Sequence, residues 1–249
     1  MIDYRLIIPM LAPVQRSNLR SHITAHLFDA ILHRELRPGE RIIEGKYARG
    51  LGVAQSTFRE ALQELEHQGL VTKSDRRGTF VTKLSVSDVD DLYVVRLELE
   101  PLAAALASQR MTREHFRHLE DILRRMKDFG RRRDFVQLLK TDLRFHQSIW
   151  KFSGNQYVEK ALNVVCPPLF ASYMIRAVSG DLYDYTNDHD EHVAMLAALK
   201  KGGPPQVAIA FRSMVEVFRI QDVENLRKYE AAHETASSES GEGVGVRDG

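Results

Sequence analysis

The sequence has a single cysteine, Cys166, and lacks any apolar run that approaches the roughly 20 residues of a membrane-spanning helix. One thiol forms no internal disulfide, so disulfide-stabilised secreted scaffolds are excluded and a reducing compartment is expected. Cys166 stands before two prolines among apolar residues, which predicts a buried, unreactive thiol. The N-terminal segment lacks the basic front and small-residue cleavage site of a signal peptide. We therefore expect a cytoplasmic protein with no membrane partner.

A strong excess of charge of one sign is also missing, because the net charge is only +1 over 249 residues. Residues 1–83 carry 13 Lys and Arg against 9 Asp and Glu, whereas residues 84–249 carry 22 against 25. The mildly basic front part suits a polyanion, but many domains that never contact nucleic acid carry as much charge. The motifs must therefore decide the function.

Residues 14–83 have the pattern of a winged helix-turn-helix domain. Apolar residues recur at helical spacing in three segments, and two short segments with strand character then flank a hairpin sequence at 74–78. Helices are predicted at 17–35, 44–49 and 55–68, and strands at 70–73 and 79–83. Gly52 supplies a tight turn between the second and third helices. Three helices followed by a hairpin are the outline of a winged helix.

The chain after residue 83 is predicted to be all-α, because no strand-like alternation occurs in it. Ser87, with Asp88 after it, is expected to cap the first helix. The predicted helices are 87–109, 112–129, 133–152, 155–177, 187–201 and 205–229. The fold class is therefore mainly α, with the winged domain followed by an antiparallel helical bundle at 84–230. Residues 231–249 are poor in apolar residues and are predicted to be a disordered tail.

The third predicted helix carries the residues expected to contact DNA. Gln55, Arg59 and Gln63 fall at successive i,i+4 positions on one face, away from the apolar residues. Arginine can bond a guanine edge with two hydrogen bonds, and glutamine can bond an adenine edge. Ser56 and Thr57 stand where hydroxyls and backbone N–H groups can hold phosphates. The plain alternative for one such segment is a solvated amphipathic helix.

The hairpin adds a basic wing. Arg76 and Arg77 stand beside the flexible Gly78, so the tip can enter the minor groove or contact the DNA backbone. An isolated hairpin of this kind would be ordinary. The ordered set of three helices, a tight turn, an arginine on the third helix and a basic wing favours binding to double-stranded DNA.

Three segments resemble the winged-helix signature of the GntR superfamily of bacterial regulators. They are RPGERI at 37–42, GVAQSTFREALQELEHQGLV at 52–71 and RRGTFV at 76–81. The helical remainder resembles the FadR-type C-terminal effector domain, so the resemblance covers about 16–230. It implies a homodimer, a palindromic operator and altered DNA binding when a small carboxylate is captured. By position, Arg59 is then the central DNA contact, with Gln55 and Ser56 flanking it and Arg77 and Gly78 at the wing tip.

The sequence departs from that family pattern at several positions. Gln55 and Gly45 stand where members commonly have arginine, which predicts a different operator sequence and weaker phosphate attraction. Lys46 is expected to replace part of that attraction. Ala54 stands where serine or threonine is usual and cannot cap the recognition helix, which costs about 1 kcal/mol unless Ser56 or Thr57 takes over.

A candidate metal site lies in the predicted bundle. Asp142 and His146 are four residues apart on one helical face, and His192 lies on a later helix. Such groups can hold Zn²⁺, Ni²⁺ or Mn²⁺, although an Asp–His pair at this spacing is as often a plain hydrogen-bonded helix pair. The resemblance implies metal binding through an Asp, a His four residues later and one His from each of two later helices. Met214 occupies the last of those positions, so a divalent metal would be held by three ligands, with water or the effector completing its shell.

The effector is expected to contact Arg96, which the resemblance places on the inner side of the first bundle helix. A buried guanidinium complements a carboxylate through paired N–H bonds. The alternative partner is Glu100, four residues later, and the two are compatible. Tyr173, Arg144 and Arg176 are further candidates whose direction the sequence does not fix.

These observations predict a DNA-binding transcriptional regulator, a repressor, whose operator binding responds to a small carboxylate. The protein is expected not to be an enzyme. The alternative is a metal-dependent hydrolase in which Asp142, His146 and His192 activate a water. A DNA-binding architectural protein without an effector is a second alternative.

Overall fold

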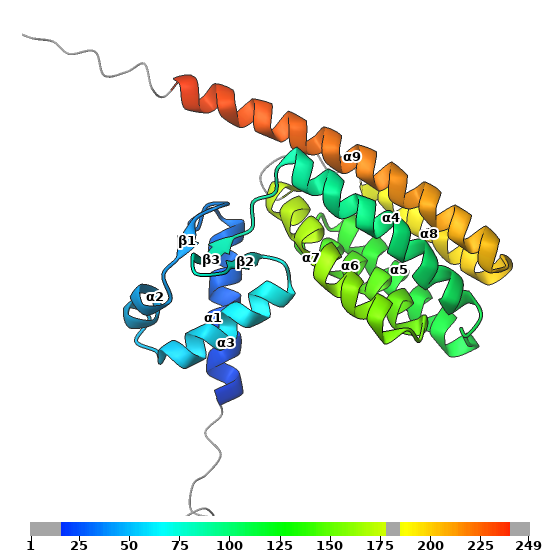
Figure 1. The fold of residues 1–249 in the computed structure, drawn as a ribbon, viewed down its shortest axis with the longest axis horizontal. Coiled ribbons are helices and arrows are strands. Elements are labelled where there is room, and N and C mark those ends of the chain that lie inside the picture. Colours follow the sequence, from blue (N-terminus) through cyan, green and yellow to red (C-terminus); the bar gives the residue numbers. More distant parts are fainter. Residues whose placement is uncertain (1–15, 178–184, 240–249) are drawn as a thin grey trace, which may run out of the picture. The chain divides into compact units, whose positions relative to one another are not determined.

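The computed structural model describes residues 16–177 and 185–239. They form two compact units, and the division along the chain falls between Val81 and Thr82. The predicted boundary lay two residues later, between 83 and 84. Within the described residues, helices dominate both units and a small sheet belongs to the first one alone (Figure 1). No helix in this part of the chain has the length and apolar character needed to cross a membrane.

The first unit is a three-helix domain with a three-stranded antiparallel sheet in the order β1-β3-β2. Its elements are α1 (Arg16–Leu32), β1 (Arg41–Ile42), α2 (Glu44–Gly50), α3 (Gln55–His67), β2 (Val71–Ser74) and β3 (Gly78–Val81). Phe58, Ala61, Leu62 and Leu65 are buried along one face of α3, where α1 packs against it. The predicted winged helix-turn-helix is confirmed, and α3 follows the apolar spacing of its sequence.

Strand β1 is the element that the sequence did not predict. Arg41 pairs with Phe80 and Ile42 with Thr79, so β1 adds a third strand beside β3. A two-residue segment is too short to show the alternation of period two that marks a strand. Only its pairing with β3 defines it.

The wing is the hairpin that joins β2 and β3. Ser74 pairs with Gly78, and Asp75, Arg76 and Arg77 lie in the turn between them. Arg76 has φ 61° and Gly78 has φ 105°, both in the left-handed region. Glycine at position 78 is therefore needed for the backbone as well as for space at the tip.

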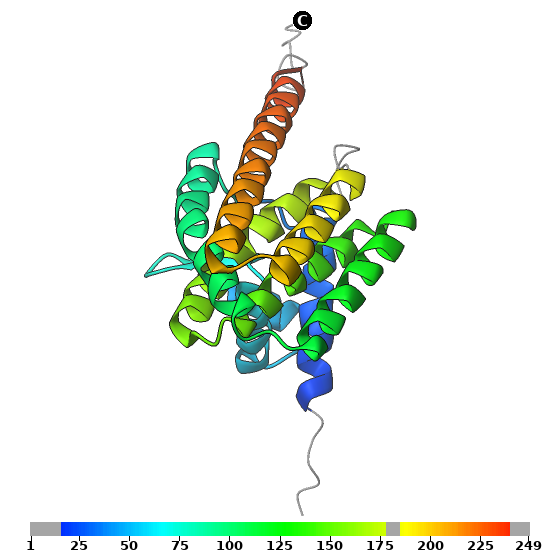
Figure 2. The same cartoon turned by 90° about the vertical axis from the view of Figure 1, so that its right-hand side faces the viewer.

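The second unit is the predicted all-α bundle. Its helices are α4 (Val86–Ser108), α5 (Arg113–Arg131), α6 (Phe135–Phe152), α7 (Gln156–Ala177), α8 (Tyr185–Lys201) and α9 (Pro204–Glu239). Helix α4 packs along α9 and also contacts α6 and α7, while α5 packs against α6 and α8 (Figure 2). The large buried side chains Phe145, Ile149 and Phe211 fill its interior. The candidate ligand residues project from α4, α6, α7, α8 and α9 into this interior.

Helix α4 begins two residues earlier than predicted, because Ser85 rather than Ser87 is its N-cap. The Ser85 Oγ accepts the Asp88 N–H at 3.2 Å, and Asp88 Oδ2 accepts the Ser85 N–H at 2.8 Å. This reciprocal pair is a capping box, which requires a spacing of three residues. Ser87 is only one residue from Asp88 and cannot form it.

The predicted disordered tail is wrong for residues 231–239, because α9 continues to Glu239. The prediction rested on the lack of apolar residues. This lack indicates that a segment is not buried, but it does not exclude a helix. The prediction gave no weight to the alanines and glutamates of this segment, which have high helix propensity. Extending an existing helix also avoids the cost of nucleation. Residues 240–249 of the predicted tail lie outside the described residues.

Candidate DNA-binding and ligand-binding sites

Helix α3 presents its predicted DNA-contacting residues to solvent. Gln55, Ser56 and Arg59 are exposed and Thr57 is half-buried, while Phe58 between them is fully buried. Arg59 has 52% of its side chain exposed. The burial of Phe58 fixes the rotation of the helix, and this rotation turns the polar face outward.

Arg59 and Gln55 meet a common partner on α2 that the sequence did not reveal. Arg59 Nη2 and Nε lie 2.9 and 3.0 Å from Glu44 Oε2, and Gln55 Nε2 donates to the same oxygen at 3.5 Å. Glu44 is the first residue of α2. Eleven and fifteen residues separate it from these partners, a distance over which sequence patterns give no signal.

The N-terminus of α3 has no side-chain cap. Ala54 is the N-cap residue, and its side chain makes no capping hydrogen bond. The first amide N–H groups of the helix thus have no N-cap acceptor, and they coincide with the positive end of its dipole. This arrangement favours a phosphate oxygen at Ser56 and Thr57.

The other basic residues that the sequence predicts to contact DNA lie on the wing and on α2. Arg76 and Arg77 are exposed in the turn, and Lys46 is exposed on α2 with its ammonium 6.0 Å from the centre of the Tyr47 ring. Arg41 of β1 was not predicted as a site residue. Its Nε lies 3.2 Å from where a Cβ on Gly78 would stand, so a third guanidinium lies against the wing. The pairing of β1 with β3 brings it there.

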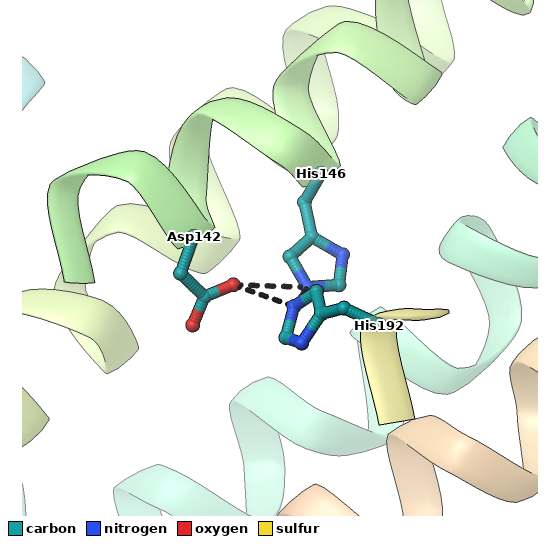
Figure 3. A group of neighbouring side chains, drawn as sticks. All are labelled: Asp142, His146 and His192. Atoms are coloured by element: carbon teal, nitrogen blue, oxygen red, sulfur yellow. Dashed lines mark hydrogen bonds and ion pairs between the residues drawn. The ribbon is translucent and has the colours of Figure 1, made fainter. Parts of the chain in front are cut away.

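In the second unit, Asp142 and His146 of α6 meet His192 of α8 (Figure 3). Asp142 Oδ1 lies 2.8 Å from His192 Nε2 and 3.3 Å from His146 Nε2, and the two Nε2 atoms are 3.2 Å apart. All three side chains are buried. The predicted ligand residues therefore converge from two helices on one point.

The donor set fits a small divalent cation. Two ligands that bind one tetrahedral ion through bonds of about 2.0–2.1 Å lie about 3.3 Å apart, close to the three separations here. One carboxylate and two neutral imidazoles suit Zn²⁺, Ni²⁺ or Mn²⁺. His146 also donates its other ring N–H, at Nδ1, to Glu100 Oε1 at 2.5 Å. A carboxylate behind a ligating histidine fixes its tautomer and ring orientation.

Glu100 of α4 is the centre of this buried network, a role that the sequence did not predict. Besides His146, its carboxylate accepts the Trp150 indole N–H at 3.0 Å and the Arg96 Nε–H at 2.6 Å. Burial opposes its ionisation, but the charges and hydrogen bonds of Arg96 and His146 prevail and hold the pKa of Glu100 below its usual range. His192 and His146 likewise lower the pKa of Asp142 against the effect of burial. Both carboxyl groups are thus ionised at neutral pH.

Arg96 is buried and forms the ion pair with Glu100 that the sequence allowed as an alternative. Its guanidinium lies 5.4 Å from the Tyr93 ring centre and 5.2 Å from the Phe170 ring centre. One terminal nitrogen is 3.5 Å from His146 Nε2. Arg96 also lines the cavity beside the Asp–His–His cluster, so both of its predicted environments occur together.

The cavity has a volume of about 60 Å³, which is room for a few water molecules or the head of a small ligand. Its lining residues are Tyr93, Arg96, Asp142, His146, Leu169, Phe170, Tyr173, Phe218, Gln221 and Asp222. Asp142 and His146 contribute the cluster, and Leu169, Phe170 and Phe218 contribute apolar contacts. The cavity therefore offers both charged and apolar surface.

Asp222 of α9 is a further acidic group in the cavity wall, and the sequence did not single it out. It forms a buried ion pair with Arg176, whose Nη1 donates to Ser172 Oγ at 2.7 Å. Burial raises the pKa of Asp222, although Arg176 and Arg96 act in the opposite direction. Of the further candidates, Tyr173 lines this cavity, Arg176 holds Asp222, and Arg144 lines a separate groove.

Two other predictions concern residues near the cluster. Met214 packs against the bundle core, four residues before Phe218, whose ring centre lies 5.6 Å from that of His192. Residues four apart share a helix face, so Met214 is on the side of α9 that faces the cluster. Cys166 is fully buried, as predicted, and burial raises the pKa of its thiol, which disfavours the reactive thiolate.

Comparison with protein families gives two matches that together span both units. Residues 19–81 match the model of bacterial regulatory proteins of the gntR family. Residues 91–217 match the FCD domain. The first match contains α2, α3 and the wing, and the second contains the whole Asp–His–His cluster.

Curated relatives and a solved structure agree with these matches. The chain is 33% identical over 136 residues, 54% of its length, to the uncharacterized HTH-type transcriptional regulator YdhC of Bacillus subtilis, and the match spans 61% of that relative. It is 30% identical over 164 residues to the Nta operon transcriptional regulator of Aminobacter aminovorans, covering 66% of this chain and 75% of that protein. The structure of McbR/YncC from Escherichia coli has the same fold, with a TM-score of 0.63, 21% identity and coverage of 85% of this chain and 98% of that one.

Proposed function

The chain belongs to the GntR family of transcriptional regulators and carries an FCD domain, and from this premise we propose that it is a metal-dependent repressor that responds to a small carboxylate. In this proposal a homodimer binds a palindromic operator through α3 and the wing. Capture of the carboxylate in the bundle weakens operator binding. The alternative of a metal-dependent hydrolase is wrong, because the fold and the relatives are those of regulators and not of enzymes.

The first unit supplies the contacts to DNA. Arg59 contacts base edges in the major groove, and the N-terminus of α3 at Ser56 and Thr57 holds a phosphate. Gln55 contributes a further base contact. Arg76, Arg77 and Lys46 neutralise phosphates and so supply affinity that depends on salt but not on sequence. The exposure of Gln55, Ser56 and Arg59 on α3, where Phe58 is buried, supports the proposal.

The observation that carries the effector proposal is the buried Asp142–His146–His192 cluster at the wall of a cavity that Arg96 also lines. A divalent cation held there would supply positive charge, and three protein ligands would leave a coordination position for a ligand. The Arg96 guanidinium lines the same cavity, stacked among aromatic rings and oriented by Glu100. A carboxylate is the group that complements both.

Charge balance supports the same ligand class. The network contains three carboxylates and two guanidinium groups, namely Glu100, Asp142, Asp222, Arg96 and Arg176. With neutral histidines their sum is −1, which repels an anion from a buried cavity. A divalent cation changes the sum to +1, and one carboxylate then neutralises it. Burial of an uncompensated charge is costly, so the neutral set is favoured.

Two arginine variants test the DNA-binding roles. The wild-type chain is first used to select preferred duplexes from a random library. Arg59→Ala should lower the preference for a selected duplex over random DNA by about 5- to 150-fold, because one bidentate contact contributes about 1–3 kcal/mol of discrimination. Arg77→Ala should weaken binding to both duplexes alike and reduce the salt slope by about 1. Fluorescence anisotropy at several salt concentrations measures both quantities.

The assignment of α3 fails if Arg59→Ala keeps the preference of the wild type. Exposed Glu66, at the other end of α3, gives the matched control Glu66→Gln, which should leave the preference intact.

The same assay with Zn²⁺ and a panel of hydroxy and simple carboxylates tests the effector. Release of the selected duplex by a carboxylate only when metal is present supports the proposal. A chain whose operator binding responds to no carboxylate would instead be an architectural DNA-binding protein.

A further inference from the structure

The two residues of α3 that are expected to contact bases share a carboxylate partner, Glu44 of α2. Glu44 Oε2 is within 3.0 Å of two guanidinium nitrogens of Arg59 and accepts the Gln55 amide at 3.5 Å. Both residues expected to contact bases therefore share one acceptor atom. The side chain of Glu44 is only 20% exposed, whereas that of Arg59 is 52% exposed. Glu44 is therefore the more buried member of the pair, and Arg59 is the more accessible one.

The geometry determines which edge of the guanidinium remains available. Glu44 occupies the side edge of Arg59, formed by Nε and Nη2. A guanidinium has five N–H donors in a rigid plane, so the outer edge, with Nη1 and the second hydrogen of Nη2, is still free. Two parallel donors at that edge match the O6 and N7 acceptors of guanine. Glu44 thus restrains Arg59 without blocking the edge that contacts a base.

We propose that Glu44 is a positioning residue that sets the sequence specificity of this regulator by holding Arg59, and with it Gln55, in the orientation that contacts bases. Arg59 without this partner is a long flexible cation that phosphates attract at any sequence. Glu44 places a negative charge beside the DNA-binding face, which lowers affinity for every duplex. Because Glu44 also holds Arg59 in place, the free energy of binding depends on the base that Arg59 contacts. The inference rests on the proposed binding of DNA through α3.

A purely local role for Glu44 is the competing explanation. It is an acidic residue in the first turn of α2, where it stabilises the helix dipole by a few tenths of a kcal/mol. That role affects the stability of the domain and acts on all DNA sequences equally. The two roles therefore separate in the ratio of affinities for selected and random duplex, which a stability change does not alter.

The test uses the full chain and the duplexes selected by the wild type. Glu44→Gln keeps the size of the side chain and removes its charge, and Glu44→Ala removes the acceptor. We expect Glu44→Gln to bind random duplex more tightly than the wild type does and to lower the specificity ratio by about tenfold. This lies within the range of about 5- to 150-fold that one bidentate contact supplies. Glu44→Ala should lower the ratio further. The matched control Glu66→Gln makes the same charge change at the far end of α3 and should leave the ratio within twofold.

A double-mutant cycle determines whether Glu44 acts through Arg59. In the Arg59→Ala background, Glu44→Gln should cause no further loss of specificity. The inference is overturned if both Glu44 variants keep the wild-type ratio, if the loss persists at full size without Arg59, or if Glu66→Gln reproduces it. A wild type that selects no duplex at all would overturn the proposed function itself, and the role of Glu44 with it. The selection step distinguishes this failure from the others.

Discussion

At the scale of single residues, Met214 at the position of a fourth ligand sets how many side chains of the cluster are available to a metal. Asp142, His146 and His192 have donor atoms within 4.8 Å of one another, and Glu100 stands behind His146. Met214 lies on the face of α9 that contacts the cluster side of the bundle, where the resemblance predicts a fourth ligand. A thioether is a poor ligand for Zn²⁺ or Ni²⁺. In the proposed site, a metal held by three protein ligands would have a coordination position open for an effector.

At this scale we predict that Met214→His tightens Zn²⁺ binding at least about tenfold, since even partners behind the ligands change metal affinity about 10- to 100-fold. Isothermal titration calorimetry of the metal-free protein measures the change. Ile209 is exposed on the same helix, and Ile209→His is the matched control that should leave the affinity unchanged. An affinity for Zn²⁺ that is equal in Met214→His and the wild type would count against a metal site at Asp142, His146 and His192.

Among the elements, α4 connects the winged unit to the cluster, because it begins five residues after Val81 and carries Arg96 and Glu100. Its start is fixed by the reciprocal bonds of Ser85 and Asp88. Hydrogen bonds from the side chain and backbone of Ser85 lower the pKa of Asp88. The carboxylate form of Asp88 therefore stabilises the folded helix.

The sign of the pH dependence follows from that direction. A carboxyl group with a lowered folded pKa contributes stability above its unfolded pKa of about 3.9 and loses it as the pH falls through the folded value. Asp88→Asn should reduce the free energy of unfolding by about 0.5–1 kcal/mol at pH 7. The difference from the wild type should shrink at low pH, below the folded pKa of Asp88, because Asp88 is then protonated in both states. Urea unfolding followed by circular dichroism measures it, with exposed Asp91→Asn as the control. A loss of the same size at pH 7 and at low pH would contradict the role of the carboxylate.

The whole molecule consists of two compact units, and each has its own buried core. The only tryptophan of the chain, Trp150, lies in the second unit and donates to Glu100. Its fluorescence therefore reports on the bundle alone, next to the cluster. This makes the stability of the bundle measurable within the intact protein.

For the whole molecule we predict that Zn²⁺ or Ni²⁺ raises the thermal midpoint of the Trp150 fluorescence transition. At a free ion concentration of 100 times Kd the folded state gains about 2.7 kcal/mol. Asp142→Asn should remove most of this gain, whereas Asp128→Asn, at an exposed site in the same unit, should keep it. If removal of metal by a chelator leaves the midpoint unchanged, the bundle holds no stabilising ion.

The sequence by itself determined the fold class and singled out the residues of both proposed sites. Helical spacing and the turn residues predicted the three helices and the wing, because a buried face repeats its apolar residues at a regular local interval. The same pattern predicted the bundle, and the spacing of Asp142 and His146 placed them on one face. The sequence also placed His192 on a later helix, and the resemblance to the GntR superfamily added the inward position of Arg96.

Only the tertiary structure decided which residues from distant segments become neighbours. Glu44 contacts Arg59 across 15 residues, Glu100 contacts His146 across 46, and Arg176 contacts Asp222 across 46. β1 exists through its pairing with β3, and Arg41 reaches the wing through that pairing. Local patterns encode the face on which a side chain lies, whereas helix packing sets the element opposite that face. Apart from the i,i+4 pairs Arg96–Glu100 and Asp142–His146, the acidic partners of the arginines and histidines therefore became visible only in three dimensions.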